Sequence, residues 1–103
     1  MTQAELFQAL KEIGYPVAYS HFKESQSPPF IVYLFSSSND FMADGTSYYE
    51  ISNFQVELYT AYKDLVAEGK VQAKLKELGL PYSKLETFIE SEGLFQILYR
   101  IQI

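Results

Sequence analysis

One helix-ending motif occurs twice in this chain, and it constrains the fold more than any other feature. Leu-Lys-Glu-x-Gly-x-Pro stands as LKEIGYP at residues 10–16 and as LKELGLP at residues 75–81. Glycine takes the left-handed conformation that often ends a helix, and the proline two residues later prevents the helix from continuing. Apolar residues at helical spacing precede both copies. The sequence therefore predicts one helix after the Thr2–Glu5 capping-box pattern and a second helix over 64–78.

The other apolar segments have the composition and periodicity of strands. They are 17–22, 30–35, 47–62, 82–91 and 94–103. The last of them, LFQILYRIQI, alternates most regularly, which places Phe95, Ile97, Tyr99, Ile101 and Ile103 on one face. In the segment 82–91, the same rule puts Leu85, Thr87 and Ile89 on one face. Residues 36–47 are expected to form a hairpin connection that turns at Asp44-Gly45. The alternation of the strand 47–62 reverses near Ser52-Asn53, which predicts a β-bulge there.

This order, α-β-β-β-α-β-β, predicts an α+β fold in a single domain over residues 1–103. Two helices would pack on one face of a mostly antiparallel sheet. The repeated motif has two interpretations that the sequence leaves open. It marks an internal duplication of an α-β-β unit, or it is a common way to end a helix.

The strand FIVYLF at 30–35 is apolar on both faces, whereas a strand with one wet face alternates. With two helices on one side, we expect a second subunit to lie against the other side. Aromatic residues are enriched both in strands and at protein interfaces. The candidate protein-interface residues are Ile31, Tyr33, Phe41, Met42 and Tyr48.

The composition argues against several classes of function. The chain has 103 residues, a formal charge of −5 at pH 7 and no cysteine, so disulfides and thiolate chemistry are excluded. Nucleic-acid affinity needs clustered Lys and Arg, and the basic residues are scattered, so no specific nucleic-acid binding is expected. No segment approaches the roughly 20 apolar residues that cross a bilayer. The N-terminus lacks the features of a signal peptide, so we expect a soluble protein made in the cytoplasm.

The residue types that act as catalysts or metal ligands in other proteins form no such pattern in this sequence. His21 is the only histidine, and its neighbour Ser20 would point to the opposite face of a strand. Asp40 and Asp44 lack the spacing of a calcium loop. Glu86 and Glu90 share a strand face that is expected to be solvated. The sequence therefore predicts no catalytic residue, no metal ligand and no cofactor, and the chain is not expected to be an enzyme.

Four segments in this order carry a family resemblance: PPFIVYL, the F-x-A-D of Phe41–Asp44, VELYT and ETFIES. Over residues 10–103 the chain resembles small virion proteins from the head–tail modules of long-tailed phages and prophages of Gram-positive bacteria. These are head–tail joining, tail-completion or tail-terminator proteins. The resemblance implies an α+β tail-terminator fold and a structural role without catalytic residues.

The resemblance also implies partners and a location. Such proteins assemble as homo-oligomeric rings, often hexameric, at the end of the tail tube nearest the head. They contact other tail or connector proteins, in the host cytoplasm during assembly and then in the virion. A negative charge suits a ring through which DNA slides, because like charges repel. The alternative from the residues alone is a small acidic protein-binding domain, regulatory or antitoxin-like.

Overall fold

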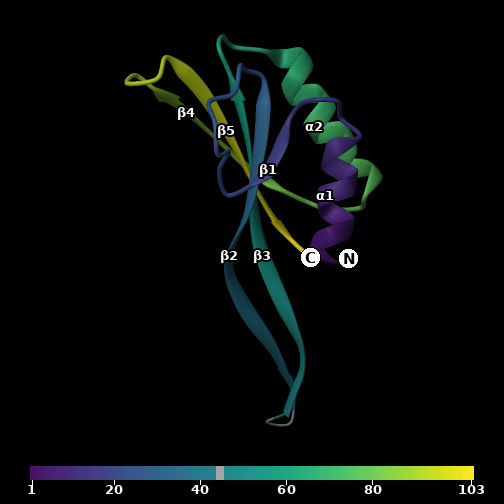
Figure 1. Ribbon diagram of the computed structural model, residues 1–103. Helices are drawn as coiled ribbons and strands as arrows, with labels where there is room; N and C mark the ends of the chain where they lie inside the picture. The colour runs from purple at the N-terminus through teal and green to yellow at the C-terminus, as the bar shows by residue number, and fades with distance from the viewer. Residues whose placement is uncertain (44–45) are drawn as a thin grey trace.

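The computed structural model describes residues 1–43 and 46–103, and it describes the side chains of residues 1–39 and 51–103. Its elements are α1 (Gln3–Lys11), β1 (Val17–Tyr19), β2 (Phe30–Ala43), β3 (Thr46–Thr60), α2 (Leu65–Glu77), β4 (Ser83–Ile89) and β5 (Leu94–Gln102). The strands lie in the order β1-β2-β3-β5-β4 (Figure 1). β1 and β2 pair parallel, and the other neighbours pair antiparallel. The chain has the α+β fold and the element order that the sequence predicts.

Side-chain caps set the start of both helices. The Thr2 hydroxyl accepts a hydrogen bond of 3.1 Å from the Glu5 amide, and the Glu5 carboxylate accepts one of 2.9 Å from the Thr2 amide. This is the predicted capping box, and it satisfies amides that have no partner inside the helix. At the start of α2, the Asp64 carboxylate accepts a bond of 3.0 Å from the Ala67 amide. Both helices therefore begin where the sequence predicts.

The repeated motif ends both helices, but the strands that follow it differ. Gly14 has a φ of +105° and Gly79 a φ of +71°, which glycine adopts at little cost. After α1, strand β1 pairs parallel with β2. After α2, strand β4 pairs antiparallel with β5. The likeness between the two halves covers the helix ends and does not extend to the strand pairing.

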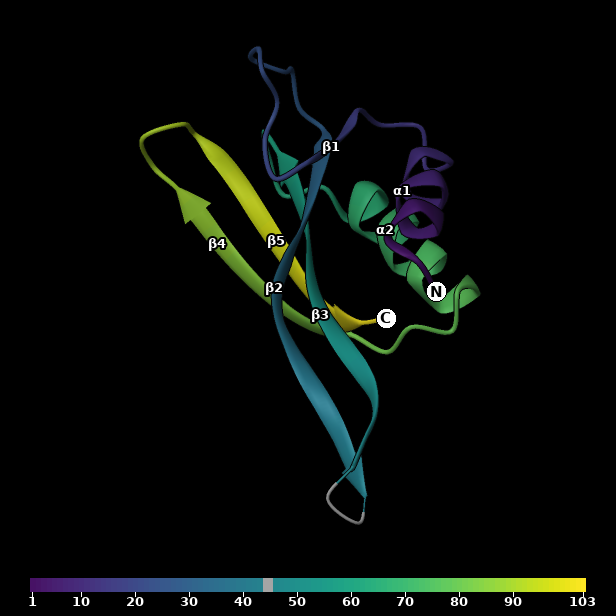
Figure 2. The same ribbon diagram turned by 60° about the horizontal axis from the view of Figure 1, so that its bottom comes forward.

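Both helices cover the same face of the sheet, as predicted (Figure 2). The buried cluster that joins them to β2, β3 and β5 contains Leu6, Leu10, Ile31, Tyr33, Phe54, Val56, Leu58, Ala67, Val71, Leu75, Ile97, Tyr99 and Ile101. The predicted alternation of β5 is confirmed, because its three members in this list are two residues apart while Arg100 and Gln102 are exposed. Burying an aliphatic side chain of this size stabilises a fold by roughly 1.5–3 kcal/mol. This cluster therefore holds the helices on the sheet.

The two edge strands differ from the prediction in detail. β1 ends at Tyr19 and not at residue 22, because Ser20 has a φ of +66° and leaves the extended conformation. In β4, Leu85 pairs with Leu98, whose neighbours in β5 lie under the helices. The apolar face of β4 therefore points away from the helices, and its polar face points toward them.

The region predicted as a connection is instead a two-stranded arm. Strand β2 continues to Ala43 and β3 begins at Thr46, so the prediction of a connection over 36–47 is wrong. Strand β5 pairs with β3 only from Asn53, and the backbone of Ile103 bonds that of Ser52. Beyond these residues β2 and β3 leave the body as a pair, and the molecule measures 50 × 27 × 24 Å (Figure 1). The predicted turn pair at 44–45 lies outside the described residues.

A β-bulge lies where the arm leaves the body. Phe35 pairs with Phe54 and Ser37 with Asn53, which leaves Ser36 as an extra residue in β2. The sequence predicted a bulge at this level of the sheet but in β3. The Ser36 hydroxyl donates a hydrogen bond of 3.0 Å to the Asn53 carbonyl, across the two strands. A bulge bends its strand and increases the local twist.

Candidate interaction surfaces

The sheet face opposite the helices carries a defined set of side chains, which we call the open face. Cross-strand partners share a face, so the residues that alternate with the buried cluster lie together on the other side. In the three central strands they are Phe30, Val32, Leu34, Gln55, Glu57, Tyr59, Gln96, Leu98 and Arg100. Among the described residues, no helix covers this face (Figure 2).

The middle row of the open face is apolar at three of its four positions. Val32 and Leu98 are only 4% and 8% exposed, and Leu85 at the sheet edge is 56% exposed. Glu57 lies between the first two, because it pairs with both. Val32 and Leu98 are therefore already covered within the chain, and Leu85 is the apolar side chain of this row that stays exposed. This is the side of the strand 30–35 for which the sequence predicts a second subunit.

The predicted interface residues fall into two groups. Ile31 and Tyr33 belong to the buried cluster and lie under α1, where a partner cannot reach them without displacing that helix. The structure thus corrects the interface prediction for these two residues. The side chains of Phe41, Met42 and Tyr48 lie outside the described residues, although their backbone is part of the arm.

The arm is a second candidate surface, because of its backbone. Over 37–43 and 46–51 each strand pairs with the other, and within the described residues no third strand lies beside them. An isolated two-stranded ribbon is marginally stable in water. Its outer edges also carry unpaired amide and carbonyl groups, which can pair with another chain. Contact with another molecule would therefore stabilise the arm.

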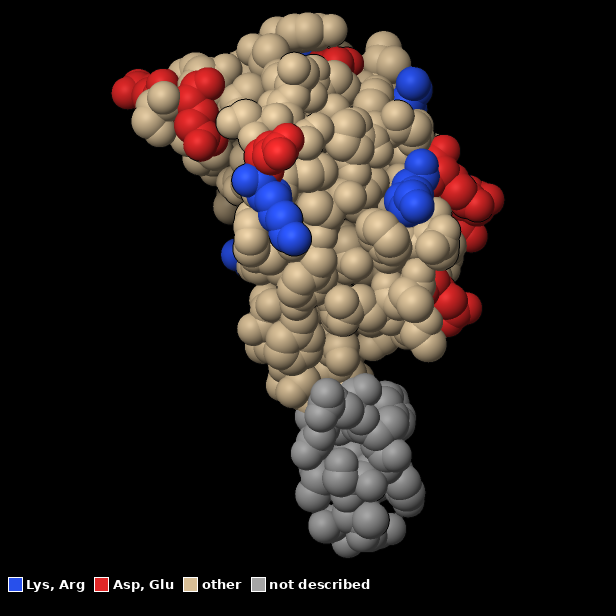
Figure 3. Space-filling model, in the orientation of Figure 1, with Lys and Arg blue, Asp and Glu red and all other residues tan. Residues whose placement is uncertain are grey.

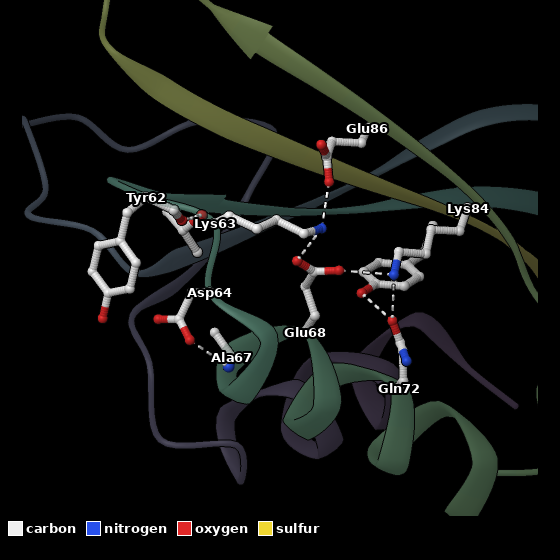
Figure 4. A network of polar contacts seen from close by, with 10 residues as sticks. Tyr62, Lys63, Asp64, Ala67, Glu68, Gln72, Lys84 and Glu86 are labelled. Carbon is white, nitrogen blue, oxygen red and sulfur yellow. Dashed lines mark hydrogen bonds and ion pairs between the residues drawn. The ribbon is translucent and has the colours of Figure 1, made fainter.

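A buried carboxylate lies between α2 and the edge of the sheet (Figure 4). Glu68 is almost fully buried, and its two oxygens lie 2.7 Å from the ammonium nitrogens of Lys63 and Lys84. Lys63 also pairs with Glu86 of β4. We call these four residues the Glu68 cluster. It explains why the polar face of β4 points toward the helices.

The cluster keeps Glu68 ionised. Burial raises the pKa of its carboxyl, but the two lysine ammonium groups outweigh that effect, and the pKa lies below its usual value. Gln72 extends the cluster into the core, since it accepts bonds of 3.0 Å from Lys84 and from the Tyr99 hydroxyl. The cluster ties α2 to the sheet. The sequence did not predict this cluster, and Glu86 was expected to be solvated. Lys84 and Glu86, two residues apart on one face of a strand, are the signal that could have indicated it.

His21 and Ser20 lie closer together than the sequence suggests. Both are exposed, and His21 Nδ1 lies 3.3 Å from the Ser20 hydroxyl, because the residues follow β1 and are not part of it. In the described part of the chain, no carboxylate hydrogen-bonds to the imidazole and orients it, as a nucleophile–base pair requires. Within the same residues, no three His, Cys, Asp or Glu side chains are placed to hold a metal ion.

Two of the hollows on the described surface lie beside the arm and the open face. The edge groove, of about 710 Å³, lies between the α2–β4 connection and the base of the arm, and Asn53 and Arg100 line it. The Asn53 amide donates bonds of 3.0 Å to Ser37 and 2.6 Å to Asn39, and it accepts one of 2.9 Å from Gln102. The face hollow, of about 230 Å³, lies on the open face beside the loop 20–26.

Charge is unevenly distributed over the molecule. Acidic side chains gather at the corner formed by the β4–β5 turn, which contains Glu90 and Glu92, and again on the opposite flank, on the side of the helices (Figure 3). The broad surface between the charged groups in that view is uncharged. Among residues 1–43 and 46–103, no helix has the length and apolar character to span a membrane.

Comparison with known proteins gives no relative to guide the assignment. No protein-family model matches the chain, and no curated protein matches it. A functional proposal therefore depends on the open face, the arm and the pattern of residues in the sequence.

Proposed function

We propose that this chain is a structural protein of a phage or prophage virion, at the head–tail junction or the tail terminus. It acts by self-assembly into a ring and by contact with neighbouring tail or connector proteins. The role is one of contact between proteins and uses no catalytic residue, cofactor or metal. In this role the protein is made in the host cytoplasm and becomes part of the virion.

The observation that carries the proposal is the two-stranded arm. A ring needs a heterologous contact, in which one surface of a subunit meets a different surface of the next. An arm that leaves one side of a compact body suits such a contact, because the arm and the body of its neighbour are different surfaces. The family resemblance of the sequence supplies the virion context, and the open face supplies a further area for partners.

Substitution in the arm tests this proposal. Phe41→Ser together with Met42→Ser should leave the fold intact and weaken assembly, since the arm lies outside the buried cluster of the body. A matched control is Leu65→Ser with Val66→Ser, which also removes two apolar side chains, 70% and 69% exposed at the start of α2. Assembly is measured by sedimentation and by electron microscopy of the protein mixed with the tail-tube protein of the same genome.

The outcomes separate the possible roles. Rings or capped tubes formed by the native protein and the control, but not by the arm variant, support the proposal. An arm variant that unfolds shows that Phe41 and Met42 stabilise the fold and are not interface residues. A stable complex with one host protein, without rings or tube contact, would favour the acidic protein-binding domain instead.

A further inference from the structure

The face hollow is built from stacked aromatic rings. The rings of Phe30 and Tyr59 stack with their centroids 5.0 Å apart and an interplanar angle of 20°. Phe22 from the loop meets Phe30 edge-on at 5.5 Å. All three residues line the hollow and are only partly buried, so aromatic surface is accessible within it. Aromatic faces of this kind attract cations.

Carboxylates surround these rings. Glu24 and Glu92 are exposed and line the hollow. The Glu57 carboxylate accepts a hydrogen bond of 2.9 Å from the Tyr59 hydroxyl, which in turn accepts one of 2.9 Å from Gln96. Burial, and then the bond to Glu57, raise the pKa of Tyr59 to about 12, so the hydroxyl keeps its proton and holds the carboxylate in place. Aromatic faces next to carboxylates attract a cation, and a guanidinium group can both stack on a ring and pair with a carboxylate.

The strands place one basic residue on the open face, and that residue is Arg100. The only other Lys or Arg in the five strands is Lys84, which faces α2. Arg100 is exposed, and among the described residues it forms no ion pair. Along β5, Arg100 lies four residues from Gln96, the partner of Tyr59. Four residues of strand span about 13 Å. Arg100 therefore lies at the far end of the face from the hollow of its own chain.

We propose that a second copy of this chain packs on the open face and seats its Arg100 in the face hollow. Leu98 lies midway between Gln96 and Arg100, so a two-fold axis across the strands at Leu98 exchanges the two ends of the face. Each copy then provides one arginine and one hollow, and the contact is self-complementary. The same axis runs along the row of Val32, Glu57, Leu98 and Leu85, so each residue of the row meets its own counterpart, and Leu85 is the apolar side chain of the row that is exposed to the second copy.

This inference deepens the self-assembly part of the proposed function and does not depend on the virion role. Two copies joined in this way form a closed pair. Growth into a ring then requires another surface, and the arm is a separate one. Packing of two sheets face to face at about 10 Å is a common arrangement. The contact places a charge pair at each end, which favours specificity.

Sedimentation of variants over a range of concentrations tests the contact. We expect Arg100→Glu to raise the dissociation constant of the pair at least about tenfold, because it places like charges together. Lys76→Glu on the exposed surface of α2 makes the same change in net charge and should leave the constant unchanged. Adding Glu92→Arg to Arg100→Glu should restore part of the affinity. Circular dichroism of each variant shows that the fold is kept.

Four results would overturn the contact. The first is a native protein that stays monomeric at all concentrations, and the second is equal weakening by Arg100→Glu and Lys76→Glu. The third is a monomer whose binding to a tail protein is lost in Arg100→Glu, because the open face is then covered by that protein. If self-association persists unchanged in Arg100→Glu, this contact is wrong while ring assembly through the arm still stands.

Discussion

At the scale of single residues, Gly69 and Gly79 differ in backbone conformation and not in the space around them. Within the described structure, a Cβ atom added at either position would meet no atom of another element within 4 Å. Gly69 lies inside α2, whereas Gly79 follows it with a φ of +71°. The repeated motif therefore needs its glycine for conformation, and the helix does not need its own.

Alanine substitutions at these two positions should have opposite effects. Gly79→Ala should destabilise the fold by about 1 kcal/mol, because an L-residue is strained at positive φ. Gly69→Ala should stabilise it by up to about 1 kcal/mol, because alanine favours the helix. Urea unfolding followed by circular dichroism measures both. A change of the same sign in the two variants would contradict this account of the motif.

Glu68 shows how one ionised residue links stability to pH. Its pKa in the folded chain lies below the usual value of 4.5. Its ionisation therefore stabilises the fold at pH values above the unfolded pKa, and that stabilisation is lost as the pH falls through the folded pKa. Acid should weaken the attachment of α2 to β4 before it affects the apolar core.

Glu68→Gln should lower the free energy of unfolding at pH 7 by about 2 kcal/mol, between the values typical of exposed and buried ion pairs. The difference from the native protein should shrink as the pH falls below 4.5. Glu77→Gln is the control, since its pair with Lys74 involves a carboxylate that is 67% exposed. Urea unfolding at several pH values measures both. A difference in the free energy of unfolding between the native protein and Glu68→Gln that stays constant with pH would argue against the ionised cluster.

At the scale of elements, the arm is the part that the sequence did not predict. The run SSSND is typical of a turn in isolation, and this led to the prediction of a connection. In the structure the backbone is paired across the arm, and at its base the Asn53 amide bridges Ser37 and Asn39. Polar side chains that bond across strands compensate for low strand propensity, and single-residue preferences do not reveal this.

Removal of the arm should leave the body folded. Replacing residues 39–51 with an Asn-Gly turn joins the cross-strand partners Ser38 and Ser52, keeps Ser52 paired with Ile103 and keeps the buried cluster complete. We expect cooperative unfolding with a midpoint close to that of the native protein, and loss of ring assembly. Thermal unfolding and sedimentation measure the two properties. A shortened chain that does not fold would show that the arm stabilises the body.

At the scale of the whole molecule, one buried cluster unites both helices with three strands. The radius of gyration is 14.8 Å, against roughly 13 Å for a compact domain of this length, and the arm accounts for the excess. The sequence predicted the fold class, the element order and the face of β5, because amphipathic periodicity and caps are local signals. The open-face hollow and the Glu68 cluster join residues far apart in sequence, which no local pattern shows.

Ile97→Asp should abolish folding. Ile97 is fully buried in the cluster, and an unpaired buried charge costs several kcal/mol, which is comparable to the whole stability of a small domain. Ile97→Val is the control and should cost only about 1 kcal/mol. Circular dichroism and thermal unfolding measure both variants. Native-like melting of Ile97→Asp would contradict the position of β5 in the core.

The bulge at Ser36 affects the direction in which the arm leaves the body, and it does not affect the cross-strand pairing within the arm. Its neighbours Phe35 and Ser37 face consecutive residues of β3, so deletion of Ser36 would preserve each cross-strand partner of the arm. The strand would lose its bend, and the tip would swing to a new position relative to the body. A single-codon deletion could thus alter the geometry of an assembly, or the size at which it closes, with every contacting side chain retained.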